Sequence, residues 1–262
     1  FMAVLYVVFA VLLLLCNVTK IPDAIVQIVQ GAFGYGDGIQ GIRAVAGGVL
    51  GAMMAAMQNG VARGIFSNEA GLGSAPIAAA AAKNKDTVRQ GLVSMTGTFI
   101  DTIVICTLTG LSIVITGAWQ VEGLEGVAVT TYAFQNGLPL PQKLTAFILM
   151  LCLVFFAFTT ILGWDYYSER CLEYLTNGHQ KKIIVYRWLY ILAVFIGPYM
   201  TVSAVWTIAD IFNGLMAIPN LIALLALSKV IVKETKAFTE KLNVEEKNQR
   251  ILTVSYTHLR AH

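Results

Sequence analysis

Charged side chains are scarce in this chain. Asp, Glu, Lys and Arg make up 13% of its 262 residues, about half of the fraction in an ordinary soluble domain. Hydrophobic residues make up 57%, and the mean hydropathy is +0.70. The formal net charge of +3 comes from basic residues in short polar stretches between apolar runs, so it describes topology and offers no basic face to nucleic acid. The composition predicts a membrane protein without a nucleic-acid partner.

Residues suited to metal, disulfide or nucleophilic chemistry are also few. The four cysteines are scattered, and the three histidines lie in a loop or near the C-terminus, so we expect neither a disulfide framework nor a Cys-x-x-Cys metal site. The patterns G-x-S-x-G and H-E-x-x-H are absent from the sequence, and the only bases available to Ser67 or Ser74 are carboxylates or distant lysines. We therefore expect no enzyme activity and no bound cofactor.

Five or six stretches are apolar over about the 20 residues that a transmembrane helix needs. They are residues 1–17, 40–60, 91–116, 143–166, 183–200 and 202–228. Between the first two, residues 20–34 place apolar side chains at helical spacing, which is typical of an amphipathic helix at a membrane surface. The fold class expected is an all-α polytopic membrane protein in contact with the lipid bilayer.

The two ends of the chain differ in character. The first apolar run has no basic segment before it and no small-residue cleavage site after it, so it is typical of a helix cut within its span rather than of a signal peptide. Residues 1–240 are predicted to form one transmembrane domain that is incomplete at its N-terminus. Residues 241–262 are predicted to be a charged tail, of which 253–262 are disordered or non-native because they show no regular periodicity.

Basic residues gather in alternate connections between the spans, whereas the 117–142 loop contains Glu122 and Glu125 and no basic residue. Cytoplasmic loops are enriched in Lys and Arg, so we expect a multi-pass protein of the cell (inner) membrane with a cytoplasmic C-terminus. The residues that carry this pattern are Lys83, Lys85, Arg89, Arg170, Lys181, Lys182, Lys229, Lys233 and Lys236.

The segment GIFSNEAGLGSAP interrupts the small-residue span with polar side chains and three glycines. Each glycine costs about 1 kcal/mol in a helix interior relative to alanine, so the pattern predicts a discontinuous helix at about 64–75. Two arrangements fit. Either a second half-helix begins after Ser74 as the N-cap with Pro76 in its first turn, or Ser67 and Asn68 cap a helix that starts at Glu69 and is kinked at Pro76.

A break at membrane depth is tolerated only where it is buried in protein or lines a water-filled cavity. An ionised Glu69 there costs about 2.5–3.5 kcal/mol on insertion scales, which favours a functional role; the alternative is a structural pair with Arg63. Freed backbone groups and polar side chains of a broken helix can bind an amino acid or a cation. Bulky apolar neighbours would admit only a small side chain. The expected substrate-binding residues are Ile65, Phe66, Ser67, Asn68, Glu69, Gly71 and Trp164, although Trp164 also suits an interfacial anchor.

Other polar residues lie inside the apolar runs. Thr159 and Thr160 follow Phe156 by three and four residues; their hydroxyls either ligate a cation or bond back to the carbonyl four residues earlier. Asp101 either takes part in cation or proton coupling or lies at a wet helix end. Asp210 and Asn213 are better explained as a packing contact between helices.

Three segments carry a specific resemblance: GVARGIFSNEAGLGSAPIAAAAAK, VRQGLVSMTGTFIDTIVICTLTGL and FFAFTTILGWDYY. They resemble the alanine or glycine:cation symporter family, the sodium:alanine symporters, over residues 1 to about 240. The resemblance implies an inverted-repeat secondary transporter, a LeuT-like bundle of two five-helix repeats whose sixth helix is broken. This chain would hold the end of the first repeat and nearly all of the second, so it would need the missing N-terminal helices in order to transport.

The resemblance also implies the function and the ion site. A small neutral amino acid, alanine or glycine, would be carried together with sodium. The Phe156 carbonyl, Thr159 and Thr160 would form a sodium site on the eighth helix. Proton coupling, with Asp101 as the coupling group, is the alternative. An ion channel is less favoured because the polar residues gather at one depth instead of along a pore.

Overall fold

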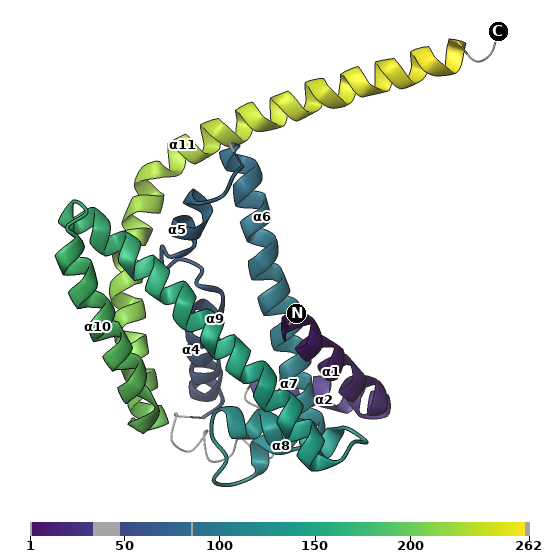
Figure 1. Ribbon diagram of the computed structural model, residues 1–262. Helices are drawn as coiled ribbons and strands as arrows, with labels where there is room; N and C mark the ends of the chain where they lie inside the picture. Colours follow the sequence, from purple (N-terminus) through teal and green to yellow (C-terminus); the bar gives the residue numbers. More distant parts are fainter. Residues whose placement is uncertain (1, 34–47, 85, 260–262) are drawn as a thin grey trace.

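The computed structural model describes residues 2–33, 48–84 and 86–259, with side chains described up to residue 244. Every regular element in these ranges is helical (Figure 1). The α-helices are α1 (Met2–Cys16), α2 (Ile21–Ala32), α4 (Val49–Asn68), α5 (Ala75–Ala80), α6 (Thr87–Phe99), α7 (Cys106–Ile115), α8 (Val127–Gly137), α9 (Gln142–Thr176), α10 (Gln180–Ile196) and α11 (Val202–Leu259). A π-helical turn, η3 (Ile100–Ile105), joins α6 to α7, and the 3₁₀ turns η1 (Val18–Lys20), η4 (Ala118–Gln120) and η5 (Gly197–Tyr199) lie between helices.

Four helical stretches of the described chain are long and apolar enough to cross a membrane. They are Thr87–Ile115, Gln142–Thr176, Gln180–Tyr199 and Val202–Val244. A fifth is present if α1 and α2, bent by 79° at their junction, count as one broken span. These stretches agree with the predicted polytopic membrane protein.

Two predicted spans need correction. The stretch 1–17 forms α1, which has only 15 residues before the chain bends. The predicted helix 40–60 appears as α4 from Val49 onward, and residues 40–47 lie outside the described part. Helix α4 does not qualify as a span by itself, because it carries polar residues such as Gln58, Asn59 and Arg63 among its small apolar ones.

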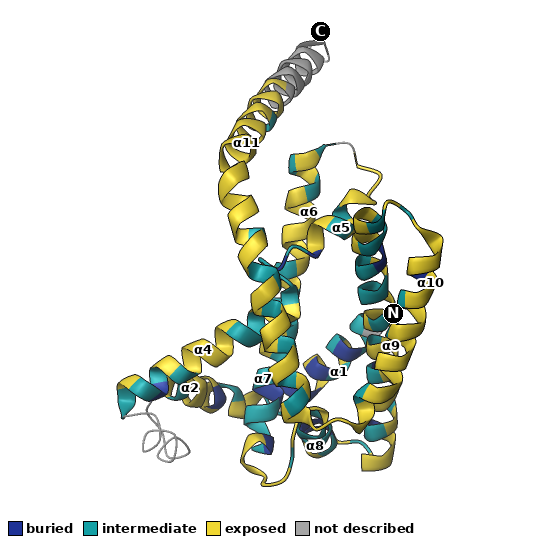
Figure 2. Ribbon diagram, turned by 90° about the vertical axis from the view of Figure 1, so that its left-hand side faces the viewer, coloured by how far each residue is buried: buried dark blue, intermediate teal, exposed yellow. Residues whose placement is uncertain are grey.

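The buried core lies at one end of the bundle, where α1, α7, α8 and α9 meet (Figure 2). Tyr6 on α1 hydrogen-bonds through its hydroxyl to Thr109 at 2.6 Å. The Asn17 amide donates to the carbonyl of Gly137 at 2.8 Å. Gly137 lies so close to α1 that a Cβ atom there would be 2.7 Å from Leu13. The small residue thus lets α8 pack directly on α1.

The remaining helices rise from this core. Helix α9 extends from α8 to the loop before α10 (Figure 1), and α4 packs against α2 and the π-helical turn η3 of the continuous helix α6–η3–α7. The connections α5–α6 and α9–α10 and the far part of α11 lie at one end, and α8 lies at the other (Figures 1 and 2). The basic connections noted in the sequence therefore share one end of the bundle.

Helices α10 and α11 expose most of their apolar side chains. Figure 2 shows most of the described residues of α11 in the colour of exposed residues. Such faces are stable against lipid tails or other apolar helices, but not against water. These exposed apolar faces explain how the chain can have a high hydropathy although few of its residues are buried.

Candidate functional site

The break in the small-residue helix extends from Glu69 to Ser74. Helix α4 continues through Gly64 to Asn68, so the break begins five residues later than predicted. Glu69 ends α4 in the left-handed conformation with φ 55°, and Gly71 and Gly73 have φ values of 83° and 86°. Only the last two glycines are needed for backbone freedom. The alternative of a helix starting at Glu69 is wrong.

The second half-helix starts as predicted, but its cap differs. Helix α5 begins at Ala75, directly after Ser74, with Pro76 in its first turn. The Ser74 hydroxyl does not cap the helix; it donates to Glu69 Oε2 at 2.6 Å. Ser74 is only 2% exposed. The Glu69 carboxylate thus joins the first residue of the break to its last.

Arg63 is paired with another helix. Its guanidinium donates two hydrogen bonds, of 3.0 and 3.1 Å, to the Asp210 carboxylate on α11. It also lies 3.9 Å from the centre of the Trp206 ring, and Phe66 packs edge-to-face on that ring at 4.9 Å. The pairing of Arg63 with Glu69 considered from the sequence is wrong, and the packing role predicted for Asp210 is confirmed.

The last residues of α4 contact the π-helical turn. The Ser67 hydroxyl donates to Asp101 Oδ2 at 2.6 Å, and the Asn68 amide donates to Thr102 Oγ1 at 2.9 Å. Asp101 lies halfway along the Thr87–Ile115 stretch, so it does not lie at a helix end. Single π-helical turns widen a helix and occur often at functional sites. Two polar pairs therefore join the break to the middle of a membrane-length helix.

A groove of about 610 Å³ lies on the other side of the break. Leu72, Gly73 and Ser74 line it from the break, and Trp164 lines it from α9. The structure thus places Trp164 near the break, whereas Phe66 packs on Trp206 instead. Ile65 and Phe66 are 36% and 37% exposed. The other residues that line the groove are Ile77, Tyr167, Ser168, Cys171, Leu172, Leu175, Tyr186, Met216, Pro219 and Asn220.

The residues of the predicted sodium site lie along α9 outside this lining. The Thr159 hydroxyl donates to the carbonyls of Phe155 and Phe156, at 3.0 Å each. This is the back-bonded arrangement weighed for the threonines. Thr160 is exposed, and the Phe156 ring packs edge-to-face on Tyr6. The sodium-binding role of these residues stays a prediction.

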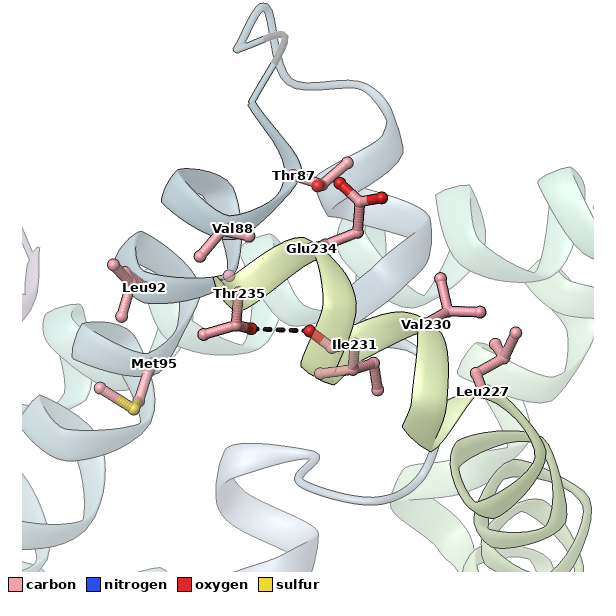
Figure 3. Close-up of a pocket in the computed structure, with 10 residues that line it drawn as sticks. Thr87, Val88, Leu92, Met95, Leu227, Val230, Ile231, Glu234 and Thr235 are labelled. Atoms are coloured by element: carbon pink, nitrogen blue, oxygen red, sulfur yellow. Dashed lines mark hydrogen bonds between the residues drawn. The ribbon is translucent and has the colours of Figure 1, made fainter. Parts of the chain in front are cut away.

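A larger groove, of about 740 Å³, separates the start of α6 from α11 (Figure 3). Its walls are apolar, with Leu92 and Met95 from α6 facing Leu227 and Ile231 from α11. None of the predicted site residues lines it. Because it has few groups that could orient a polar ligand, the break is the better candidate site.

Sequence reasoning missed three contributors to the site: Tyr167, Trp206 and Asn220. Asn220 donates from its amide to the carbonyl of Gly71 at 2.8 Å. It follows Pro219 inside an apolar helix, and a proline followed by a polar residue in an apolar run was a signal available from the sequence. The two aromatic residues gave no such signal, because a Trp or Tyr in a membrane helix is ordinary.

A bundle of membrane-length helices with a polar break in one helix is typical of membrane transport proteins. The chain belongs to the sodium:alanine symporter family, whose sequence profile matches residues 1–252. This family consists of transporters, not enzymes.

Curated relatives agree with this assignment. The chain is 47% identical over 251 residues to the sodium/alanine symporter AgcS of Methanococcus maripaludis, covering 95% of this chain and 52% of the relative. It is 40% identical over 240 residues to the probable sodium/glutamine symporter GlnT of Bacillus subtilis, covering 92% and 47%. It is 34% identical over 257 residues to the sodium/proton-dependent alanine carrier protein of Bacillus sp. PS3, covering 92% and 55%. The chain spans about half the length of these relatives.

Proposed function

We propose that the intact protein carries a small neutral amino acid, alanine or glycine, across the cell membrane together with sodium. The observation that carries this proposal is the break Glu69–Ser74, which holds the Glu69–Ser74 hydrogen bond and directly follows Ser67, whose hydroxyl donates to Asp101 within an apolar bundle. Two relatives are named for alanine together with sodium. The sodium gradient would drive uptake.

The proposed fold is the LeuT-like inverted repeat, with α4 and α5 as the two halves of its broken helix. The basic connections share one end of the bundle, which supports a cytoplasmic location for that end and for the C-terminus. In alternating access, one group of helices rocks against the other around a fixed site at the break.

The substrate would bind where the break meets the groove beside Trp164. Gly71 and Gly73 leave backbone amides and carbonyls of the break outside any helix. These groups and the side chains of Ser67, Asn68 and Glu69 suit the charged ends of an amino acid. Trp164 lines this groove and would limit the side chain to a methyl group or a hydrogen. Ile65 and Phe66 lie outside the groove lining, at the end of α4, and would limit the side chain where the substrate reaches that end. One relative is named for glutamine, whose side chain is larger than that of alanine. The proposed size limit therefore has to be tested with glutamine as a competitor.

Two sets of oxygen atoms are candidates for the coupling ion. Asp101 and the Ser67 hydroxyl lie 2.6 Å apart beside the break. The Phe156 carbonyl and the hydroxyls of Thr159 and Thr160 form the second set, on α9. Oxygen ligands of both kinds suit a hard cation such as sodium.

Proton coupling is the second candidate. One relative is named for sodium and protons, and the carboxylates of Asp101 and Glu69 both lie at the break. Carboxylates inside membrane proteins serve in proton relays as well as in ion pathways. Uptake coupled to sodium should depend on the sodium gradient, whereas uptake coupled to protons should depend on the pH gradient.

The test is uptake of radiolabelled L-alanine by proteoliposomes that contain the intact gene product, with glycine, leucine and glutamine as competitors. We expect uptake that needs sodium and is blocked by glycine but not by leucine or glutamine. Glu69→Gln should reduce it strongly, because the side chain keeps its size and loses its charge. Uptake that is independent of sodium and follows an imposed pH gradient would replace sodium by protons. Absence of concentrative uptake of both labelled alanine and labelled glycine would contradict the proposal.

A further inference from the structure

Helix α11 contacts the broken helix at two points, one before the break and one within it. Before the break, Arg63 on α4 pairs with Asp210 on α11. Within the break, the carbonyl of Gly71 accepts a hydrogen bond from the Asn220 amide at 2.8 Å. The two positions on α11 are ten residues apart, which is about 15 Å along a helix. A single helix therefore contacts both the first half of the broken helix and the break itself.

The contact at Asn220 is also sterically close. A Cβ atom at Gly73 would lie 3.1 Å from Asn220 Oδ1 and 3.3 Å from its Cβ. Gly73 has a φ of 86°, so glycine is favoured there both by the backbone and by the neighbour. Pro219 lies inside α11 directly before Asn220, where a proline removes one backbone hydrogen bond and bends the helix. The bend and the break thus meet at one place.

The hydrogen bond from Asn220 gives the Gly71 carbonyl a partner that the broken helix no longer supplies. A carbonyl in a broken helix has lost its helical partner, and at membrane depth lipid cannot replace it. Asn220 supplies that partner from a position 149 residues away. Without the amide, the Gly71 peptide would be free to reorient toward water or ligand, and the adjoining Glu69–Ser74 turn with it.

We propose that Asn220 is a positioning residue, which fixes the Gly71 peptide and thereby the orientation of the polar break. This inference rests on the proposed function, since it assigns to α11 a part in shaping the proposed substrate site. It implies that α11 and the broken helix move together when the site changes access.

The first test compares Asn220→Ala with Asn213→Ala in the intact gene product. Asn213 lies seven residues earlier on the same face of α11, and among the described residues it has no hydrogen bond to the break. Loss of one net hydrogen bond shifts an equilibrium by about three- to tenfold. We therefore expect the KM for alanine and the half-saturating sodium concentration both to rise by that factor in Asn220→Ala. Asn213→Ala should behave as wild type.

Asn220→Asp serves as a second variant of the same size. It replaces the donor by an acceptor facing the Gly71 carbonyl, so its effect should equal or exceed that of Asn220→Ala. It also keeps the test decisive if the alanine variant does not fold. A wild-type KM and sodium dependence in the Asp variant would overturn the proposed role, while sodium-driven uptake by the wild type would leave the symporter itself intact.

A readout independent of transport completes the experiment. Ala70 is exposed within the break, so a cysteine introduced there reports how firmly the break is held. The rate at which a charged thiol reagent modifies Ala70→Cys should rise several-fold when Asn220→Ala is added, after subtraction of labelling of the parent protein. An unchanged rate would overturn the positioning role. Absence of sodium-dependent uptake by the wild type would contradict the proposed function instead, and the labelling rate would then decide on Asn220.

Discussion

The hydrogen bond between Ser67 and Asp101 offers the sharpest test of cation coupling. It joins the end of α4 to the π-helical turn at 2.6 Å. A hydrogen bond to a charged group contributes about 1.5–3 kcal/mol, which corresponds to about 10- to 150-fold in an equilibrium constant. Ser67 is exposed and Asp101 half-buried, so we expect the lower end of that range. Asp101→Asn should raise the half-saturating sodium concentration about tenfold.

The assay is a double-mutant cycle on sodium-dependent alanine uptake. Ser67→Ala, Asp101→Asn and the double variant are compared with wild type, each corrected for the amount of protein in the liposomes. If the two side chains act through their contact, the double variant should be no worse than the worse single variant. Multiplicative effects would show that the two side chains act independently of their contact. A wild-type sodium dependence in Asp101→Asn would refute the assignment of Asp101 to coupling.

Three further predictions follow from separate contacts. Thr160→Ala should raise the half-saturating sodium concentration at unchanged protein amount, and a wild-type value would remove the threonines from the ion site. Gly137→Ala would place Cβ 2.7 Å from Leu13; overpacking costs about 1–3 kcal/mol, so the melting temperature in detergent should fall by about 2–12 °C. The control Gly110→Ala, with open space at its Cβ, should not lower it. Arg63→Lys should also lower the melting temperature, by the equivalent of up to about 1 kcal/mol at this partly exposed pair, because lysine cannot make both hydrogen bonds of the guanidinium to the Asp210 carboxylate. An unchanged melting temperature would show that this two-bond geometry does not contribute to stability.

Local sequence properties predicted a large part of the architecture. The apolar runs gave the membrane class and the later spans, because burial in lipid demands about 20 apolar residues in a row. Pro76 and Ser74 located the start of α5 correctly. The glycines correctly predicted that the helix is broken, but they did not predict the residue at which the break begins. Gly64 stays helical, since one glycine costs too little to end a helix that is packed on its neighbours.

Pairings between distant residues were beyond such reasoning. Arg63 was weighed against Glu69 because they are six residues apart, yet its partner Asp210 lies 147 residues away. Which helix faces which depends on the packing of the whole bundle, and periodicity does not encode it. The Asn220 contact with the break has the same origin. Its polarity inside an apolar run was visible, but its partner was not.

Glu69 shows how the break combines strain and function. It occupies a left-handed conformation, with φ 55° and ψ 16°, which costs a non-glycine residue about 1–2 kcal/mol. Glycine would fit that backbone without strain, and the chain places glycine at two nearby positions of the same kind. The hydrogen bond from Ser74 to the carboxylate contributes about 1.5–3 kcal/mol, which offsets the strain. A carboxylate at this point therefore stabilises the break only together with Ser74, so anything that draws the Glu69 carboxylate away from Ser74 also loosens the end of α4. Through this hydrogen bond, an ammonium group or cation bound at Glu69 would change the conformation at the end of α4 and at the start of α5 together.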